Sequence, residues 1–210
     1  MPGVFLVFAL LLAGGGFGAT YYLNNESAGG DGTTAALTGE HAAFASPAAV
    51  LAALRDETVP HTVIVFEGDG SQYVLQDTTT SSRTADAWLT WQAADGESPM
   101  FRVELRPGGT VPQYHYYKFD GLIFSGAFYE YNSSNVAHVW LQNSNYVTFE
   151  NCTWQGVGWD YQVDPTYQAG LYLWVGVSNV TLTNCLFIPA SSGVHDVMGA
   201  GRAAHPDQGF

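Results

Sequence analysis

Positive charge is scarce in this chain. Six Lys and Arg residues oppose 19 Asp and Glu residues, so the formal net charge is −13, and Lys118 is the sole lysine. Nucleic acids and anionic membrane surfaces are bound by clustered cations, so the composition argues against both kinds of partner. Charged residues make up only 12% against 47% hydrophobic, and there are 24 glycines, which is typical of a turn-rich β protein with a packed core.

Cysteine is equally rare. Cys152 and Cys185 are the only two, and they occupy the same position in successive copies of a repeat described below. Stacked strands lie about 4.8 Å apart, which is within the Cα separation that a disulfide tolerates. The pair is therefore either a disulfide or an unbonded apolar ladder, and two cysteines alone do not make a zinc site.

Long hydrophobic runs are absent as well. The uninterrupted apolar run at residues 4–12 is too short to span a bilayer. It is followed by Gly16 and Gly18, small residues at the right places for a signal-peptidase cut before Ala19. We therefore predict a signal peptide at residues 1–18 and a secreted protein, extracellular or periplasmic, with no membrane association after the signal is removed.

A short phrase recurs three times, at residues 122–129, 147–154 and 180–187. Its template is apolar, any, apolar, any, Asn or Gly, small, any, aromatic, and its copies are offset by 147−122 = 25 and 180−147 = 33 residues. The alternation is that of a strand followed by a turn, and repeated units of this length stack into solenoids. A second apolar strand precedes each late copy, at residues 136–141 and 170–175.

One helix stands before the run of strands. Ser46 is a suitable N-cap, Pro47 suits the first helical position, and apolar residues share one face up to Leu54. We predict a capping helix in an N-terminal segment at residues 19–60, followed by incomplete solenoid coils at residues 61–210. No closing element precedes Phe210, so the tail is either a coil cap or a truncation; because solenoids are capped at both ends, we expect truncation.

The chain resembles the right-handed parallel β-helix, pectin lyase-like superfamily. The resemblance is carried over residues 19–200 by the opening strand 19–23, the Gly-rich loop 29–33, the capping helix and the Ser-Asn-led phrases. It implies an all-β, right-handed parallel β-helix solenoid with a short N-terminal capping α-helix. It also implies an asparagine ladder at Asn151 and Asn184, only two rungs long because Gly126 departs from the pattern.

The strands before the phrases offer a binding surface. If alternate residues point inward, then His138, Trp140, Tyr172 and Trp174 point outward. Aligned on Ser-Asn, Trp140 would stack over Trp174, and His138 over Tyr172. Such a row is either a platform for sugar rings or is covered by the loop at residues 159–168.

Candidate catalytic groups lie near this row. Asp160 and Asp164, on the inserted loop, are candidate acids or calcium ligands, and His195 is a candidate base. The resemblance implies that a lyase would use Lys or Arg as its base and calcium to neutralise a uronate, and the available cations include Lys118, Arg102, Arg106 and Arg202. No family catalytic motif is matched.

These observations predict an exported carbohydrate-active β-helix protein. It would be polysaccharide lyase-like or glycoside hydrolase-like, and would act on or bind an extracellular polysaccharide, with calcium as a possible cofactor. The alternative is a non-catalytic surface or adhesion β-helix protein. Fold resemblance alone does not decide between them.

Overall fold

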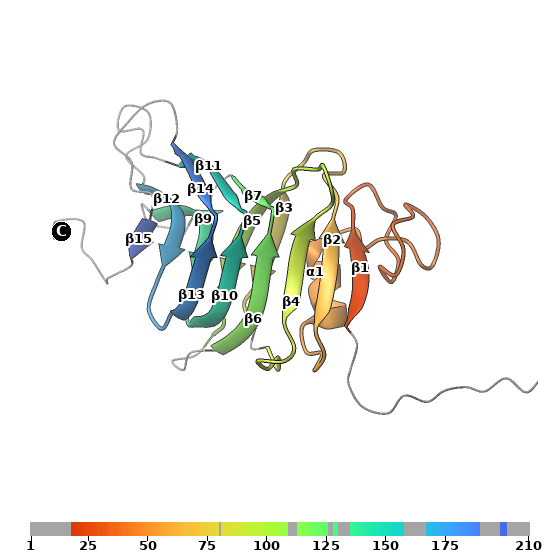
Figure 1. The fold of residues 1–210 in the computed structure, drawn as a ribbon, viewed down its shortest axis with the longest axis horizontal. Helices are drawn as coiled ribbons and strands as arrows, with labels where there is room; N and C mark the ends of the chain where they lie inside the picture. Colours follow the sequence, from red (N-terminus) through yellow and green to blue (C-terminus); the bar gives the residue numbers. More distant parts are fainter. Residues whose placement is uncertain are drawn as a thin grey trace, which may run out of the picture.

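The structure, a computed structural model, describes residues 18–79, 81–108, 113–125, 128–129, 135–157, 167–189 and 198–200 (Figure 1). The one helix in these residues is α1 (Pro47–Leu54). The strands are β1 (Ala19–Leu23), β2 (His61–Val65), β3 (Tyr73–Asp77), β4 (Leu89–Ala93), β5 (Met100–Leu105), β6 (Gln113–Asp120), β7 (Ile123–Phe124), β8 (Phe128–Tyr129), β9 (Asn135–Leu141), β10 (Ser144–Glu150), β11 (Thr153–Val157), β12 (Tyr167–Leu173), β13 (Ser178–Thr183), β14 (Leu186–Pro189) and β15 (Met198–Ala200). Within the described ranges, no helix is long and apolar enough to cross a membrane.

The strands stack in parallel. Six of them form the first sheet in the order β1-β2-β4-β6-β10-β13, which is the row of arrows running from red to blue in Figure 1. Among the described strands, every pairing is parallel except that of β8 with β9. Parallel neighbours cannot be joined by a hairpin, so the chain circles through the other faces before it returns.

The second sheet supplies those other faces. Strand β5 joins them, because Met100 and Phe101 pair with β7 while the residues from Val103 to Leu105 pair with β9. One turn is then β6-β7-β9, the next β10-β11-β12 and the third β13-β14-β15. The predicted parallel β-solenoid is confirmed, with about three such turns.

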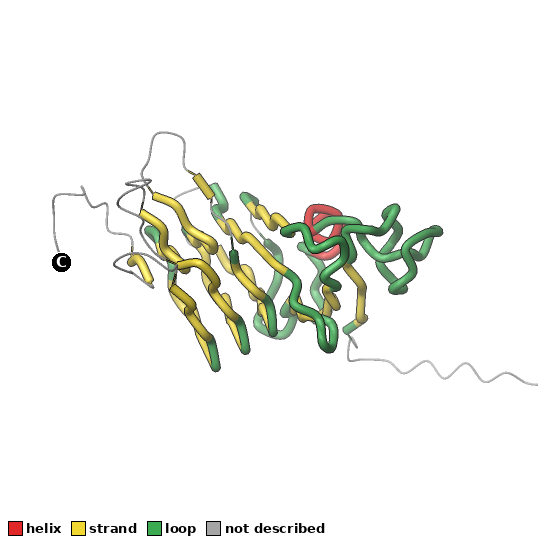
Figure 2. Tube along the Cα trace, turned by 90° about the horizontal axis from the view of Figure 1, so that it is seen from above, coloured by secondary structure: helices red, strands yellow, loops and turns green. Residues whose placement is uncertain are grey.

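The predicted helix is also confirmed. Ser46 accepts a hydrogen bond from the Ala49 backbone N–H at 3.3 Å, and Pro47 is the first helical residue. The helix buries its apolar face in the core and packs on β3 at the N-terminal end of the solenoid (Figure 2). Its last carbonyl, of Leu54, accepts a hydrogen bond from the buried Arg83 guanidinium, which also donates to Ala87 O at 2.5 Å. That it caps the solenoid stays a prediction.

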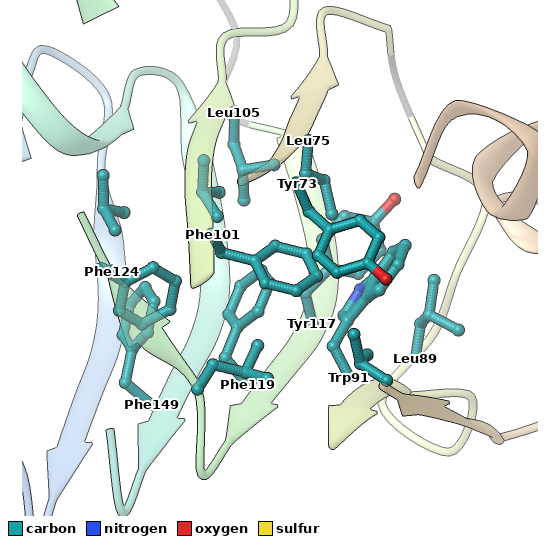
Figure 3. Close-up of a cluster of buried hydrophobic side chains, with 14 of the residues drawn as sticks. Tyr73, Leu75, Leu89, Trp91, Phe101, Leu105, Tyr117, Phe119, Phe124 and Phe149 are labelled. Carbon is teal, nitrogen blue, oxygen red and sulfur yellow. The ribbon is translucent and has the colours of Figure 1, made fainter. Parts of the chain in front are cut away.

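The core consists of side chains stacked turn upon turn. Along the first sheet the register places Val63 opposite Trp91, Trp91 opposite Phe119, and Phe119 opposite Phe149. The Phe119 and Phe149 rings stack with centroids 5.2 Å apart and planes at 14°, and Phe124 closes on both from the second sheet (Figure 3). Rings stacked in this way gain aromatic packing beyond the burial of their apolar area.

The predicted repeat is corrected in its first copy. Val147 pairs with Tyr117, so the offset is 147−117 = 30 residues, not 25, and the equivalent copy is residues 117–124. Residues 122–124 instead pair with β11 through Ile123 and Phe124, which belong to another face. The template matched the wrong face because strands on every face of a solenoid share the same inward alternation.

The asparagine ladder is present with its two predicted rungs. Asn184 Nδ2 donates to Asn151 Oδ1 at 2.7 Å, and Asn151 Nδ2 donates to Asp120 Oδ1 at 2.8 Å. Both asparagines are left-handed, with φ of 52° and 53°, and the equivalent residue one turn earlier is Gly121 at φ 71°, not Gly126. Asn and Gly are the residues that enter this conformation at least cost, so the turn geometry selects them.

The cysteines lie one turn apart, as predicted, and both are free thiols. The Cys152 thiol donates to Glu150 O at 3.1 Å. Burial raises the pKa of Cys152 to about 12, so it is protonated at neutral pH and a poor nucleophile. The structure thus contains the unbonded ladder rather than the disulfide.

Replacing Phe119 with Ala should destabilise the protein by about 3–5 kcal/mol, because the fully buried ring is held on both sides by other rings. Urea unfolding monitored by circular dichroism would measure the loss. Gln92→Ala, on the outer face of the neighbouring strand, should change stability by less than about 0.5 kcal/mol. Equal effects at the two positions would contradict the inward assignment of Phe119.

Asn151→Ala should destabilise the protein by about 2 kcal/mol, since it loses two ladder hydrogen bonds and places a Cβ in the left-handed region. Asn151→Gly loses the same hydrogen bonds without the conformational penalty and should cost less. Thermal unfolding of the two variants separates the terms. The turn conformation would be refuted if Gly proved as damaging as Ala.

The buried His115 makes stability depend on pH. Among the described residues its ring nitrogens have no hydrogen-bond partner, and burial lowers its pKa to about 4, against the opposing effect of Asp77. The unfolded chain, with an ordinary histidine pKa, therefore binds a proton first as the pH falls below about 6.5. Between pH 7.5 and pH 5 this histidine should remove about 2 kcal/mol of stability.

Urea unfolding at both pH values would test this in wild type and in His115→Phe, which cannot titrate. The variant should lose less stability on acidification than the wild type. The same loss in both would show that His115 is not the responsible group.

Candidate functional site on the outer face of β5, β9 and β12

One outward row crosses four turns of the second sheet. Gln76 pairs with Glu104, Glu104 with Trp140, and Trp140 with Tyr172. These positions are equivalent in successive strands, so the parallel register brings together residues that are far apart in the sequence.

The predicted alignment within this row is wrong by one strand position on each side. Trp140 lies opposite Tyr172, not over Trp174, because β12 and β9 pair at an offset of 172−140 = 32 residues. The Ser-Asn alignment had implied 34. The cause is the turn at residues 174–177, which has two more residues than the equivalent turn at residues 142–143. A longer turn changes the spacing of Ser-Asn without changing the strand register.

The aromatic residues of the row form a cluster of their own, outside the main core. The Trp140 and Tyr172 rings meet edge to face at 5.0 Å, and Tyr172 stacks on Trp174 at 5.5 Å. Trp140 is 1% exposed and Tyr172 7%, whereas Trp174 is half-buried. Of the two alternatives set by the sequence, the first two rings therefore follow the covered one, and Trp174 is the ring that solvent reaches.

A fixed guanidinium borders this cluster. Arg106 Nη1 lies 2.9 Å from Glu104 Oε1, Arg106 Nε donates to Gln142 Oε1 at 3.2 Å, and the Arg106 Cζ sits 4.5 Å from the centroid of the Trp140 ring. The Glu104 carboxylate is 9% exposed as a residue and also accepts from Gln76 Nε2 at 2.8 Å. A buried carboxylate held by two partners and a cation over an indole fix the Arg106 head in place.

His138 lies beside the cluster but points into the protein. It is buried, and its Nδ1 donates to Phe124 O at 3.2 Å. Burial lowers the His138 pKa, so the ring is neutral at neutral pH. It supports the site as a neutral hydrogen-bond donor and offers no exposed contact.

The sole lysine is elsewhere. Lys118 lies on the outer face of the first sheet, with Nζ 2.7 Å from Glu150 Oε2 and 3.5 Å from Asp120 Oδ2. The hydrogen bond from Glu150 raises the Lys118 pKa, and Asp120 adds to the effect. A lyase base must first lose its proton, so this environment disfavours Lys118 in that role.

The remaining predicted groups are not placed. Asp160, Asp164 and His195 lie outside the described residues. Within the described part of the chain, no three His, Cys, Asp or Glu side chains are grouped to hold a metal, so the expected calcium has no ligand set there.

The polar part of the site was not assembled by the sequence. Arg106 is a candidate base on the sequence alone, but its contact with Trp140 and the roles of Glu104, Gln76 and Gln142 are not visible in it. One signal was available: residues 102, 104 and 106 alternate Arg, Glu and Arg, which on a strand places three charges on one outer face.

The fold and this face define the chain as a parallel β-solenoid that carries an aromatic and charged outer row. No protein-family model, curated protein or solved structure matches it.

Proposed function

We propose that the chain is an exported, carbohydrate-active β-helix protein of the pectin lyase-like kind, which binds extracellular polysaccharide on the outer face of β5, β9 and β12. The observation that carries the proposal is the Arg106 guanidinium, fixed by Glu104 and Gln142 beside the Trp140 cluster. Rigid polar groups next to aromatic surface are what a sugar, with its hydroxyls and apolar C–H faces, requires of a site.

Each accessible group has a defined task. Trp174 presents the half-buried ring on which a sugar face packs, while Tyr172 and Trp140 support that ring from behind. Arg106 and Gln142 supply hydrogen bonds to sugar hydroxyls or to a uronate carboxylate. Because Arg106 is already oriented, little side-chain entropy is lost when the sugar binds.

Cleavage would require additional groups. Asp160 and Asp164 are the proposed acids or calcium ligands and His195 the proposed base, while Glu104 is already paired with Arg106 and so is a poor general base. Lyase and hydrolase chemistry differ in their products, so the assay below separates them.

The second candidate is a non-catalytic surface or adhesion solenoid. It is favoured by the burial of Trp140 and Tyr172, which leaves Trp174 as the accessible ring of the predicted row. A binding surface needs no acid–base pair, and the described part of this face contains none.

The test is a screen of the full-length protein against pectin, alginate and neutral glycans, with binding followed by affinity electrophoresis. Trp174→Ala should weaken binding about tenfold. The double variant Glu104→Gln/Arg106→Gln should do the same without leaving a buried charge unpaired. Gln92→Ala, on the other sheet, is the matched control and should bind as wild type.

The products separate the two candidates. An unsaturated product that absorbs in the ultraviolet marks a lyase, new reducing ends alone mark a hydrolase, and binding without either marks the non-catalytic protein. The proposed site is wrong if a glycan bound by the wild type is bound equally by both site variants.

A further inference from the structure

A ladder of aromatic rings runs along the outside of the first sheet. Trp88, Tyr116 and Tyr146 each directly precede one of the paired inward residues Leu89, Tyr117 and Val147, so they occupy one equivalent position in three successive turns. Trp88 meets Tyr116 edge to face at 5.5 Å, and Tyr116 stacks on Tyr146 at 4.7 Å with an angle of 15° between the rings. All three side chains are half-buried, so part of the ladder faces solvent.

The two tyrosines have a backbone conformation that does not suit them. Tyr116 has φ 52° and Tyr146 φ 58°, and the register shifts between Asn145 and Val147, which marks a bulge. Left-handed backbone is uncommon for bulky residues, whereas Asn enters it readily.

The next turn shows which residue the fold itself prefers. Asn179 holds the same position, before Val180, with φ 53°. The geometry therefore recurs from turn to turn and is met at least cost by Asn. Strained residues of this kind persist where they serve a function, so the tyrosines need a reason other than backbone stability.

The surface beside the ladder is polar but nearly neutral. The next outward row contains Thr90, Lys118 and Thr148 in register. Lys118 is paired with Glu150 and Asp120, so its charge is compensated locally. Together with the net charge of −13, this disfavours a polyanion and favours a neutral, hydroxyl-rich ligand.

We propose that Trp88, Tyr116 and Tyr146, with the adjacent threonine row, form a second binding face, for a neutral polysaccharide strand that lies along the solenoid axis. The strand would contact one aromatic ring per turn, so its affinity would come from several equivalent contacts. This face is on the first sheet, whereas Arg106 and Trp174 are on the second, and the inference stands whether or not the Arg106 site binds sugar.

The test uses the full chain in affinity electrophoresis with soluble xylan, galactomannan and hydroxyethyl cellulose, and alginate as the anionic comparison. The double variant Tyr116→Asn/Tyr146→Asn places at both positions the residue found at Asn179. It should lose about tenfold or more in affinity for the neutral glycan, while its melting temperature stays equal to that of the wild type or rises. Tyr116→Phe/Tyr146→Phe keeps the rings and should bind within about threefold of wild type.

Two controls locate the effect. Tyr22→Asn replaces a half-buried outward tyrosine on β1 of the same sheet and should leave binding unchanged. Trp174→Ala tests the other face and should also leave binding to the neutral glycan at the ladder unchanged, which separates this inference from the proposed function.

Three results would overturn the inference. The first is that none of the neutral glycans retards the wild-type protein. The second is unchanged binding in the Asn double variant. The third is a melting temperature several degrees lower in that variant, because the tyrosines would then be retained for stability by their stacking.

Discussion

The parallel register between successive turns is the constraint on which the rest of this structure depends. Each inward residue rests on the residue at the same position one turn earlier, so Trp91, Phe119 and Phe149 form one buried column. The register that stacks the core also stacks the outside. Outward rows, turn residues and bulges therefore recur at fixed positions, and a functional surface on a solenoid is a row rather than a pocket.

The turns show how local backbone geometry selects residue types. At the turn after the first sheet, left-handed conformation recurs and is met by Gly121, Asn151 and Asn184, as conformational cost would suggest. At the bulge before the first sheet the same conformation recurs, but two of the three residues are tyrosines. The contrast between the two positions distinguishes a residue chosen by the fold from one that the fold merely tolerates.

The outer surfaces differ in how their charges are used. On the second sheet, Glu104 and Gln142 hold Arg106 against Trp140, so the cation has a fixed direction. On the first sheet, Lys118 is neutralised by two carboxylates beside a row of threonines. With so few cations in the chain, the placement of these two determines which face suits a polar or acidic sugar and which suits a neutral one.

Periodicity alone was enough to predict a parallel solenoid, the helix at residues 47–54, the two asparagine rungs and the equivalent positions of the cysteines, because each depends on local alternation and turn chemistry. The register depended on the tertiary structure. Residues 122–129 fit the repeat template yet belong partly to another face, and a turn two residues longer moved Trp140 from Trp174 to Tyr172. The burial of that ring, and the approach of Arg106 to it, were likewise decided by packing. Alternation says that a side chain points inward or outward, but only the stacked strands determine which residue it meets.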